Sequence, residues 1–228
     1  MTTILQIETA TQVCSAAISI DGKTVALKEE TAQNIHAGSL TLFIEEVMQR
    51  ASLEYKDLDA IAVSKGPGSY TGLRIGVSTA KGLCFALDKP LLAIDTLKMM
   101  ASGFLSEVED YDGLICPMID ARRMEVFTAV YDTKLNLLSP VTAMIIDECS
   151  FSEELKVTPI TFIGDGAMKC SAVLDSDNST FLDTNFNSAS NMSTIAFELY
   201  CKEGFSDLAY FEPYYLKDFV VTQSKRKV

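Results

Sequence analysis

The chain has 228 residues, which fits one large domain or two small ones. Its 19 Lys and Arg residues and 31 Asp and Glu residues give a formal net charge of -12 at pH 7. Such an acidic chain should repel nucleic acid, because its one obvious basic cluster, Lys225-Arg226-Lys227, is typical of a solvated tail. No segment approaches ~18 consecutive apolar residues, so no transmembrane helix is expected.

The start of the sequence and the cysteines both bear on the compartment. Residues 1–4 have neither the basic residues nor the apolar run of a signal peptide. None of the six cysteines belongs to a Cys-x-x-Cys pair, and most lie inside apolar stretches. This usage is typical of reduced, buried thiols rather than of a zinc site or a disulfide framework. We therefore expect a cytoplasmic protein.

The first half of the chain predicts three strands followed by alternating helices and strands. Asp21-Gly22 between the second and third strands is a hairpin signal. The predicted elements are strands 4–10, 15–21 and 24–31, helix 38–51, strand 59–64, helix 71–87, strand 90–95 and helix 97–108. Their order is β-β-β-α-β-α-β-α.

The second half predicts the same order more weakly, followed by a packed aromatic extension over 210–219. Its elements are strands 114–120, 125–132 and 137–146, a short helix at 150–156, strand 158–163, a helix from 166 to about 174, strand 180–183 and helix 190–203. Two copies of one topology predict a duplicated α/β unit with mixed sheets covered on both faces. We assign an N-terminal lobe to residues 1–110 and a smaller C-terminal lobe with the extension to 111–228.

A glycine-rich loop joins strand 59–64 to helix 71–87. Glycine leaves room for close backbone approach, and proline fixes φ, so the loop has a defined shape. It does not end in the Gly-Lys-Ser/Thr of a Walker A loop, and it misses the dinucleotide spacing by one residue. The residues that shape it are Gly66, Pro67, Gly68, Gly72 and Gly76.

The helix that follows carries only two charges, Arg74 and Lys81, and is apolar or small almost all round. This pattern predicts a helix that is covered on more than one side. Small residues recur every four positions, which allows another backbone to approach closely. They are Gly72, Gly76, Ala80 and Cys84. We expect a second helix, from this chain or from a partner, to cover this face.

Acidic residues and glycines follow equivalent strands of the two halves. Glu8 and Asp120 end the two first strands, and Gly66 and Gly164 end the two fourth strands. In a two-lobed nucleotide enzyme, these ends would face each other across a cleft, and the acids would hold a metal. Acids at strand ends also serve as caps and ion-pair partners.

Residues Lys65 to Gly76 closely resemble the hallmark of the bacterial TsaB (YeaZ) family, and the similarity spans nearly the whole chain. The other matching pieces are Ile7-Glu8-Thr9-Ala10, Asp120-Ala121-Arg122-Arg123-Met124-Glu125-Val126-Phe127, Gly164-Asp165-Gly166 and Pro213-Tyr214-Tyr215-Leu216. The resemblance implies the two-lobed actin-like ATPase (ASKHA) fold, which is related to ribonuclease H. It also implies a role in adding threonylcarbamoyl to the adenosine beside the anticodon in tRNAs that read codons beginning with A. The family is grouped with the M22 glycoprotease-like proteins.

In that family the TsaB chain is a non-catalytic partner of the paralogous transferase TsaD, together with the ATPase TsaE. TsaD carries a His-x-x-x-His pair for a metal, whereas His36 is the only histidine here. The motif Glu8-Thr9-Ala10 also lacks the glycine that kinases carry at this place. Both departures favour a scaffold without a catalytic residue, metal or cofactor of its own.

As a scaffold, the chain would use helices 38–51 and 71–87 to pack against TsaD, or against a second copy when alone, and would contact tRNA only through its partner. The candidate interface residues are Leu42, Phe43, Glu46, Leu73, Arg74, Val77 and Lys81. The alternative is an ATP-dependent small-molecule kinase or ATPase, in which Glu8 and Asp120 hold Mg²⁺ and Gly164 and Asp165 approach the nucleotide. A metallopeptidase is disfavoured by the single histidine and the absence of His-Glu-x-x-His.

Overall fold

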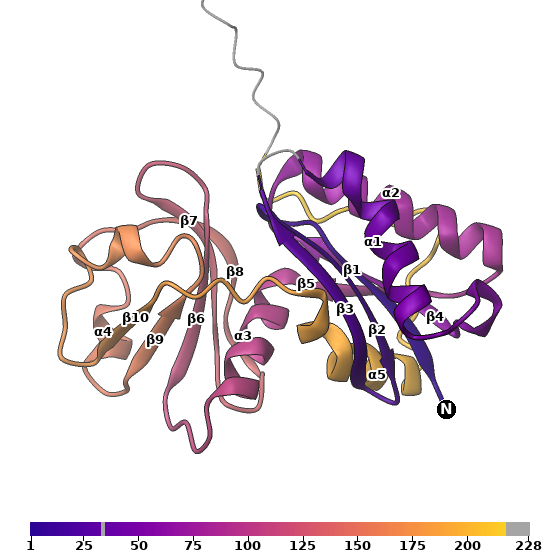
Figure 1. Cartoon of the computed structure of the whole chain (residues 1–228). Coiled ribbons are helices and arrows are strands. Elements are labelled where there is room, and N and C mark those ends of the chain that lie inside the picture. Colours follow the sequence, from indigo (N-terminus) through magenta and orange to yellow (C-terminus); the bar gives the residue numbers. More distant parts are fainter. Residues whose placement is uncertain (33–34, 218–228) are drawn as a thin grey trace, which may run out of the picture.

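The computed structural model describes residues 1–32 and 35–217, which form two five-stranded mixed sheets (Figure 1). The first sheet has the order β3-β2-β1-β4-β5 and the second has the order β10-β9-β6-β7-β8. Read from its opposite edge, the second sheet has the order β8-β7-β6-β9-β10. This repeats the order of the first sheet, with β6 to β10 in the places of β1 to β5. The predicted duplication of one α/β unit is therefore confirmed.

The bounds of the elements follow the predicted ones closely in the first half. It contains β1 (Thr3–Glu8), β2 (Val13–Ile20), β3 (Lys23–Thr31), α1 (His36–Arg50), η1 (Tyr55–Asp57), β4 (Ala60–Gly66), α2 (Tyr70–Leu87), β5 (Leu91–Asp95) and α3 (Thr96–Glu107). The second half contains β6 (Leu114–Asp120), β7 (Glu125–Tyr131), β8 (Leu137–Ile145), α4 (Ser152–Leu155), β9 (Ile160–Ile163), η2 (Met168–Cys170), β10 (Ser179–Leu182), η3 (Ala189–Met192) and α5 (Ser193–Cys201).

The first sheet is built around β1, all six residues of which are buried. This strand pairs antiparallel with β2 and parallel with β4, and Leu5 lies opposite Ile18 on one side and Ile61 on the other. A strand buried on both faces is expected in the centre of a sheet that helices cover on both sides. The turn before β3 has positive φ at both Asp21 and Gly22, as the hairpin signal predicted.

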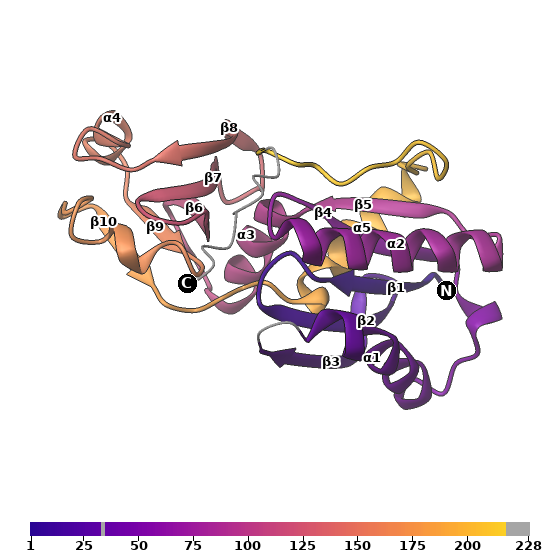
Figure 2. The same ribbon diagram turned by 90° about the horizontal axis from the view of Figure 1, so that it is seen from above.

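The sheets and helices pack in layers around three apolar cores (Figures 1 and 2). Helices α1 and α2 pack on the outer face of the first sheet, as shown by residues such as Leu40 and Val77. Between the sheets lie α3, η3 and α5, in a core that includes Ile94 and Ile119. The outer face of the second sheet is covered by α4 and η2, where Phe162 is central.

Two details differ from expectation. The helix predicted from 166 to about 174 is only the short 3-10 helix η2 between two turns, because most backbone bonds there reach three residues back, as from the N–H of Cys170 to the carbonyl of Ala167 at 2.9 Å. Of the six free cysteines, Cys149 and Cys201 are exposed, whereas we expected buried thiols.

The end of the described chain returns to the first sheet. Helix α5 contacts β1 and β5, and the segment 202–217, hereafter the strap, then runs along the sheet edge. The backbone N–H of Ser206 donates to the carbonyl of Leu91 at 2.9 Å. Figure 2 shows the strap passing along β5 and α2 toward β8.

Three further expectations concern domain division, the basic cluster and membrane spans. The division at residues 110 and 111 remains a prediction, and the Lys225–Lys227 cluster lies outside the described residues. No helix in the described residues is long and apolar enough to cross a bilayer.

Candidate functional site

The glycine-rich loop after β4 encloses the chain's own turn between β1 and β2. The N–H of Ser69 donates to the carbonyl of Ala10 at 2.6 Å. A Cβ added to Gly68 would overlap that same carbonyl, and one added to Gly72 would overlap the carbonyl of Thr9. Only glycine lets two backbones meet this closely. The loop therefore holds protein backbone at the place where a phosphate loop would hold a ligand.

The helix face behind the loop is closed in the same way. Thr9 Oγ1 donates to the carbonyl of Gly72 at 2.8 Å, and a Cβ on Gly76 would overlap the same hydroxyl. The whole small stripe is buried on this side of α2. Its members are Gly72, Gly76, Ala80 and Cys84. The stripe lets another backbone approach closely, as expected, but that backbone is the turn between β1 and β2 of the same chain and not a second helix.

The strap packs against the glycine-rich loop near Gly66 and Lys65. Gly66 has φ of +114°, and a Cβ there would lie 2.6 Å from the carbonyl oxygen of Tyr214. The N–H of Tyr214 donates to the carbonyl of Lys65 at 2.7 Å, and Pro67 follows Gly66 through a cis peptide bond. The five glycine and proline positions that we assigned to loop structure thus all contact, or directly adjoin, the chain's own backbone.

The strap is also attached along α2. Lys81 Nζ donates to the carbonyls of Phe211 at 2.9 Å and Ala209 at 3.3 Å. The rings of Tyr70 and Tyr215 lie 4.6 Å apart at their centroids. Lys81, which we assigned to a partner interface, is therefore committed to the chain's own C-terminal segment.

Glu8, the first candidate metal ligand, is sealed inside the protein. The residue is 0% exposed, and burial raises its pKa to about 7, against the opposing effect of the hydrogen bond from the N–H of Ala10. Its Oε2 has no hydrogen-bond partner among the described residues. Because no solvent reaches this carboxyl, it does not offer an open edge to a hydrated Mg²⁺ with bound phosphates.

Asp120, the second candidate, is neutralised within its own lobe. Its carboxylate forms an ion pair with Lys169, and its N–H donates to Asp165 Oδ1 at 2.9 Å. The neighbouring Gly164 has φ of +98°, and a Cβ there would lie 2.6 Å from the carbonyl oxygen of Met118. This glycine is thus explained by packing on β6 and not by the approach of a nucleotide.

Metal-binding side chains do not gather elsewhere in the part of the chain that the structure describes. In residues 1–32 and 35–217, no three His, Cys, Asp or Glu side chains lie close enough together to hold a metal ion. His36 is buried, with Nε2 3.1 Å from the carbonyl oxygen of Val13, so it ties α1 to β2. The residues at the predicted nucleotide positions do not fit Mg-ATP.

Three of the seven predicted interface side chains lie in the interior. Phe43, Leu73 and Val77 are 5%, 0% and 3% exposed, because they point from α1 and α2 into the protein. As surface contacts these three assignments are wrong. Leu42 is 60% exposed, and Glu46 lies partly exposed on the same helix, where it pairs with Arg50. Arg74 is also exposed.

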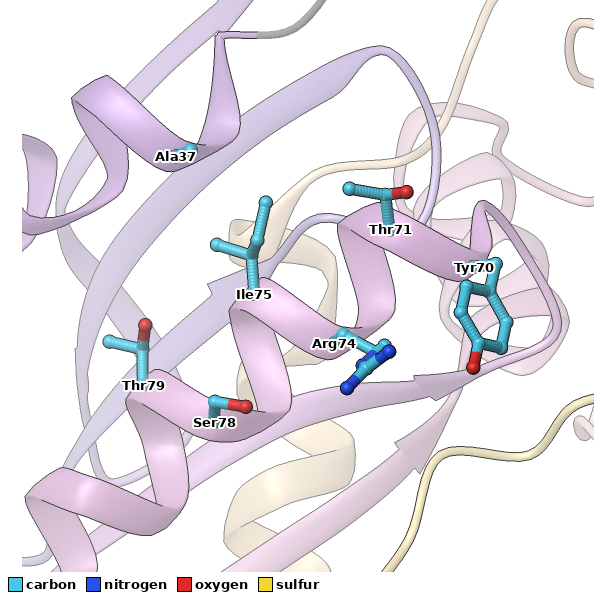
Figure 3. A pocket seen from close by; sticks show the side chains of 7 residues that line it. All are labelled: Ala37, Tyr70, Thr71, Arg74, Ile75, Ser78 and Thr79. Atoms are coloured by element: carbon cyan, nitrogen blue, oxygen red, sulfur yellow. The ribbon is translucent and has the colours of Figure 1, made fainter.

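A hollow of about 670 Å³ lies beside α2 and contains the exposed Arg74. In Figure 3, Ile75 of α2 and Ala37 of α1 face each other across the hollow. Arg74 lies on the side of α2 that is turned away from Ala37, with its Cζ atom 5.5 Å from the centre of the Tyr70 ring. The lining residues are Ala37, Tyr70, Thr71, Arg74, Ile75, Ser78 and Thr79. Apart from Arg74, our sequence-based assignment missed them. The signal was the spacing of Thr71, Ile75, Ser78 and Thr79, which places them along one uncharged helical flank.

The family model described as TsaD, tRNA N6-adenosine threonylcarbamoyltransferase, matches residues 27–218. A Bacillus subtilis (strain 168) protein named "tRNA threonylcarbamoyladenosine biosynthesis protein TsaB" is 34% identical over 166 residues, which cover 71% of this chain and 70% of that protein. The chain belongs to the TsaB (YeaZ) family.

Other TsaB proteins match over shorter stretches. Those of Haemophilus influenzae and Escherichia coli are each 34% identical, over 55% and 58% of this chain, and these alignments span about half of each relative's own length (52% and 56%). The solved structure "YeaZ from Pseudomonas aeruginosa" has a TM-score of 0.83 at 23% identity, covering 95% of this chain and 100% of that one. The activator of a 2-hydroxyisocaproyl-CoA dehydratase from Clostridium difficile has a TM-score of 0.53 at 9% identity, covering 89% and 97%. The actin-like ATPase fold is therefore confirmed.

Proposed function

We propose that this TsaB-family chain takes part in the biosynthesis of threonylcarbamoyladenosine in tRNA as a non-catalytic subunit that binds the paralogue TsaD. The names of its relatives support the pathway. The main support for the scaffold role is the difference between two faces of α2. One face of this helix is closed by the chain's own backbone at Gly72, while the opposite flank around Ile75 borders an open hollow.

The open flank suits a helix of a partner. Its side chains are short, and Gly38 and Gly82, one on each helix, have nothing within 4 Å of the place where a Cβ would be. Helices pack by setting the ridges of one into the grooves of the other, with axes about 8–10 Å apart, and small residues permit the shorter distances. Leu42 on α1 offers an exposed apolar contact at the side of this surface.

Arg74 adds a charged contact to this surface. The residue is exposed, and its guanidinium lies over the Tyr70 ring, 5.5 Å from the ring centre. An arginine held in this way can pair with a carboxylate through two parallel hydrogen bonds. We infer that the partner helix presents an acidic residue opposite Arg74, next to small side chains that fill the hollow.

The test is binding of purified TsaD to the variant Ser78→Arg, which fills the hollow from an exposed position without touching the core. We expect at least a tenfold loss of affinity by calorimetry, with an unchanged thermal midpoint. Thr133→Arg, an equally exposed hydroxyl residue in the β7–β8 turn, is the matched control and should bind like the parent chain. Equal binding by Ser78→Arg would refute the assigned surface.

The same surface would pair two copies of the chain when TsaD is absent, because a self-complementary patch gives a two-fold dimer. In sedimentation, the parent chain should then be a dimer and Ser78→Arg should be a monomer.

We further propose that TsaE joins the complex. We also propose that tRNA contacts come through the partner, since the chain is strongly acidic. Reconstitution of the modification reaction with and without this chain tests whether it is required.

A further inference from the structure

A second hollow, of about 460 Å³, lies between the start of α3 and the hairpin formed by β7 and β8. Its polar lining residues are Asp95, Lys98, Tyr131 and Asn136. None of its lining residues belongs to α1 or α2, so it is separate from the surface that we assign to TsaD. The scaffold role gives this hollow no task.

The Tyr131 side chain supplies a hydrogen-bond donor to the hollow. The residue is only 2% exposed, and its hydroxyl forms no hydrogen bond within the described residues. It is nevertheless not one of the fully sealed polar atoms that lack a partner there, so the hydroxyl faces the hollow that Tyr131 lines. Burial, and then the negative charge of Asp95, raise the pKa of this hydroxyl. It is therefore protonated at neutral pH and free to donate.

Lys98 gives the hollow a free positive charge. The charge of Asp95 is already balanced, because its Oδ1 lies 3.1 Å from Nζ of Lys65. Lys98 is half-buried and forms no ion pair within the described residues. Asp132, in the hairpin, is occupied by the turn itself, since its carboxylate accepts from the backbone N–H and the side-chain amide of Asn136, each at 2.8 Å. The hollow therefore favours an anion.

The start of α3 adds to this attraction. The first N–H groups of an α-helix have no partner within the helix and carry a partial positive charge. Asp95 precedes the helix, but its side chain does not cap these N–H groups. Asp95 and Lys98, at the two ends of this first turn, both line the hollow. An anion held there would meet the helix start, the ammonium of Lys98 and the hydroxyl of Tyr131 together.

The hairpin side of the hollow is apolar. It is formed by Leu135, Leu137 and Val141. Leu135 and Val141 are partly buried and pack against the core between the two sheets. Ligand sites commonly combine apolar walls with a few polar groups that fix orientation. Inorganic phosphate would use only the polar side of this hollow, whereas a carboxylate on a short apolar body uses both sides.

We propose that this hollow binds a small organic carboxylate. Lys98 pairs with the carboxylate, the Tyr131 hydroxyl donates to one of its oxygens, and the apolar body packs on Leu135 and Val141. Hydrogen bonds to an ionised group are shorter and stronger than those between neutral groups, so these contacts select a carboxylate over its uncharged amide. The bound molecule joins α3 of the first half to the hairpin of the second.

The test uses phenylacetate and its uncharged counterpart phenylacetamide as probes, each titrated into the full chain. Two-dimensional NMR follows the backbone amides of Lys98 and Asn136. We expect saturable shifts with phenylacetate and affinity at least about fivefold lower for phenylacetamide, which cannot pair with Lys98. Equal affinity for the two probes, or no saturable shift with phenylacetate, would overturn the proposal.

Three variants assign the binding to this hollow. Lys98→Met and Tyr131→Phe should each weaken phenylacetate several-fold, the first by removing the ammonium and the second by removing only the hydroxyl. Lys134→Met, an exposed lysine of the same hairpin that does not line the hollow, is the matched control and should bind like the parent chain. Circular dichroism shows whether each variant is folded. Equal affinity of folded Lys98→Met and Lys134→Met would place the probe elsewhere and refute the site.

Discussion

Thr9 and Gly72 lie so close that the threonine hydroxyl donates to the glycine carbonyl at 2.8 Å and the threonine carbonyl occupies the space of a glycine side chain. This contact joins the first turn of the chain to the first turn of α2. The amino-terminal end of a helix is a common anion site. Here Ser69 caps it by accepting from the N–H of Gly72 at 3.2 Å, and the chain's own backbone covers it.

The first prediction concerns two glycines of the same helix. Gly72→Ala should lower the free energy of unfolding by about 1–3 kcal/mol or more, because the new methyl group has no room beside Thr9. Gly82→Ala should raise it by about 0.5–1 kcal/mol, because nothing lies within 4 Å and alanine restricts the unfolded chain. Urea unfolding followed by circular dichroism measures both. Similar stabilities of the two variants would contradict the account of α2.

The second prediction concerns the strap. Lys81→Met removes the ammonium that binds the carbonyls of Ala209 and Phe211, so the strap should open more often. Chymotrypsin should then cleave near Phe211 several times faster than in the parent chain. Lys56→Met, which breaks only an exposed pair with Glu54, serves as the control. Unchanged cleavage of Lys81→Met would mean that the strap is held by its other contacts alone.

The third prediction is a pH dependence in the β7–β8 turn. The side-chain amide and backbone N–H of Asn136 hold the pKa of Asp132 below its ordinary value, with smaller help from Lys134. The unfolded chain therefore takes up this proton at higher pH. The turn is stabilised above the ordinary Asp pKa, and this stabilisation is lost as pH falls through the lowered one. In Asn136→Ala, carboxyl NMR titration should show the Asp132 pKa higher than in the parent. No rise would show that the hydrogen bond from the Asn136 side-chain amide does not form, because alanine keeps the backbone N–H.

The fourth prediction concerns nucleotides. Because Glu8 is sealed and Asp120 is paired with Lys169, titration of the isolated chain with Mg-ATP should give no binding heat. The parent chain and Asp120→Asn should behave alike. Saturable binding that is lost in Asp120→Asn would restore the kinase interpretation.

The sequence pattern predicted the order of elements because strands and helices differ in period and because glycines mark the turns. The apolar residues Ile4, Leu5 and Ile7 of β1 are buried, and so are Leu40, Ile44, Val47 and Met48, which recur along one face of α1. The helix expected after Gly166 was too long, since the pattern does not distinguish an α-helix from a run of turns and a short 3-10 helix.

The candidate site was predicted less well because a pattern shows which face of a helix is small but not what lies opposite. The stripe from Gly72 to Cys84 was expected to face a second helix, yet at Gly72 and Gly76 it meets Thr9, more than sixty residues earlier in the chain. Lys81 was assigned to the same partner because the strap, 128 residues later, is invisible to local periodicity. Apart from Arg74, the open flank of α2 around Ile75 is lined mainly by serine and threonine, and these residues give no strong signal.

The position of α5 and Ser206 against the first sheet has a consequence for biosynthesis. A ribosome releases β1 to β5 early, but the segments that cover one face and one edge of that sheet emerge last. Until then the nascent chain exposes the apolar inner face around Ile4 and Leu92. A premature stop before η3 would leave this face covered by α3 but without η3 and α5, so such truncated products should aggregate or depend on chaperones.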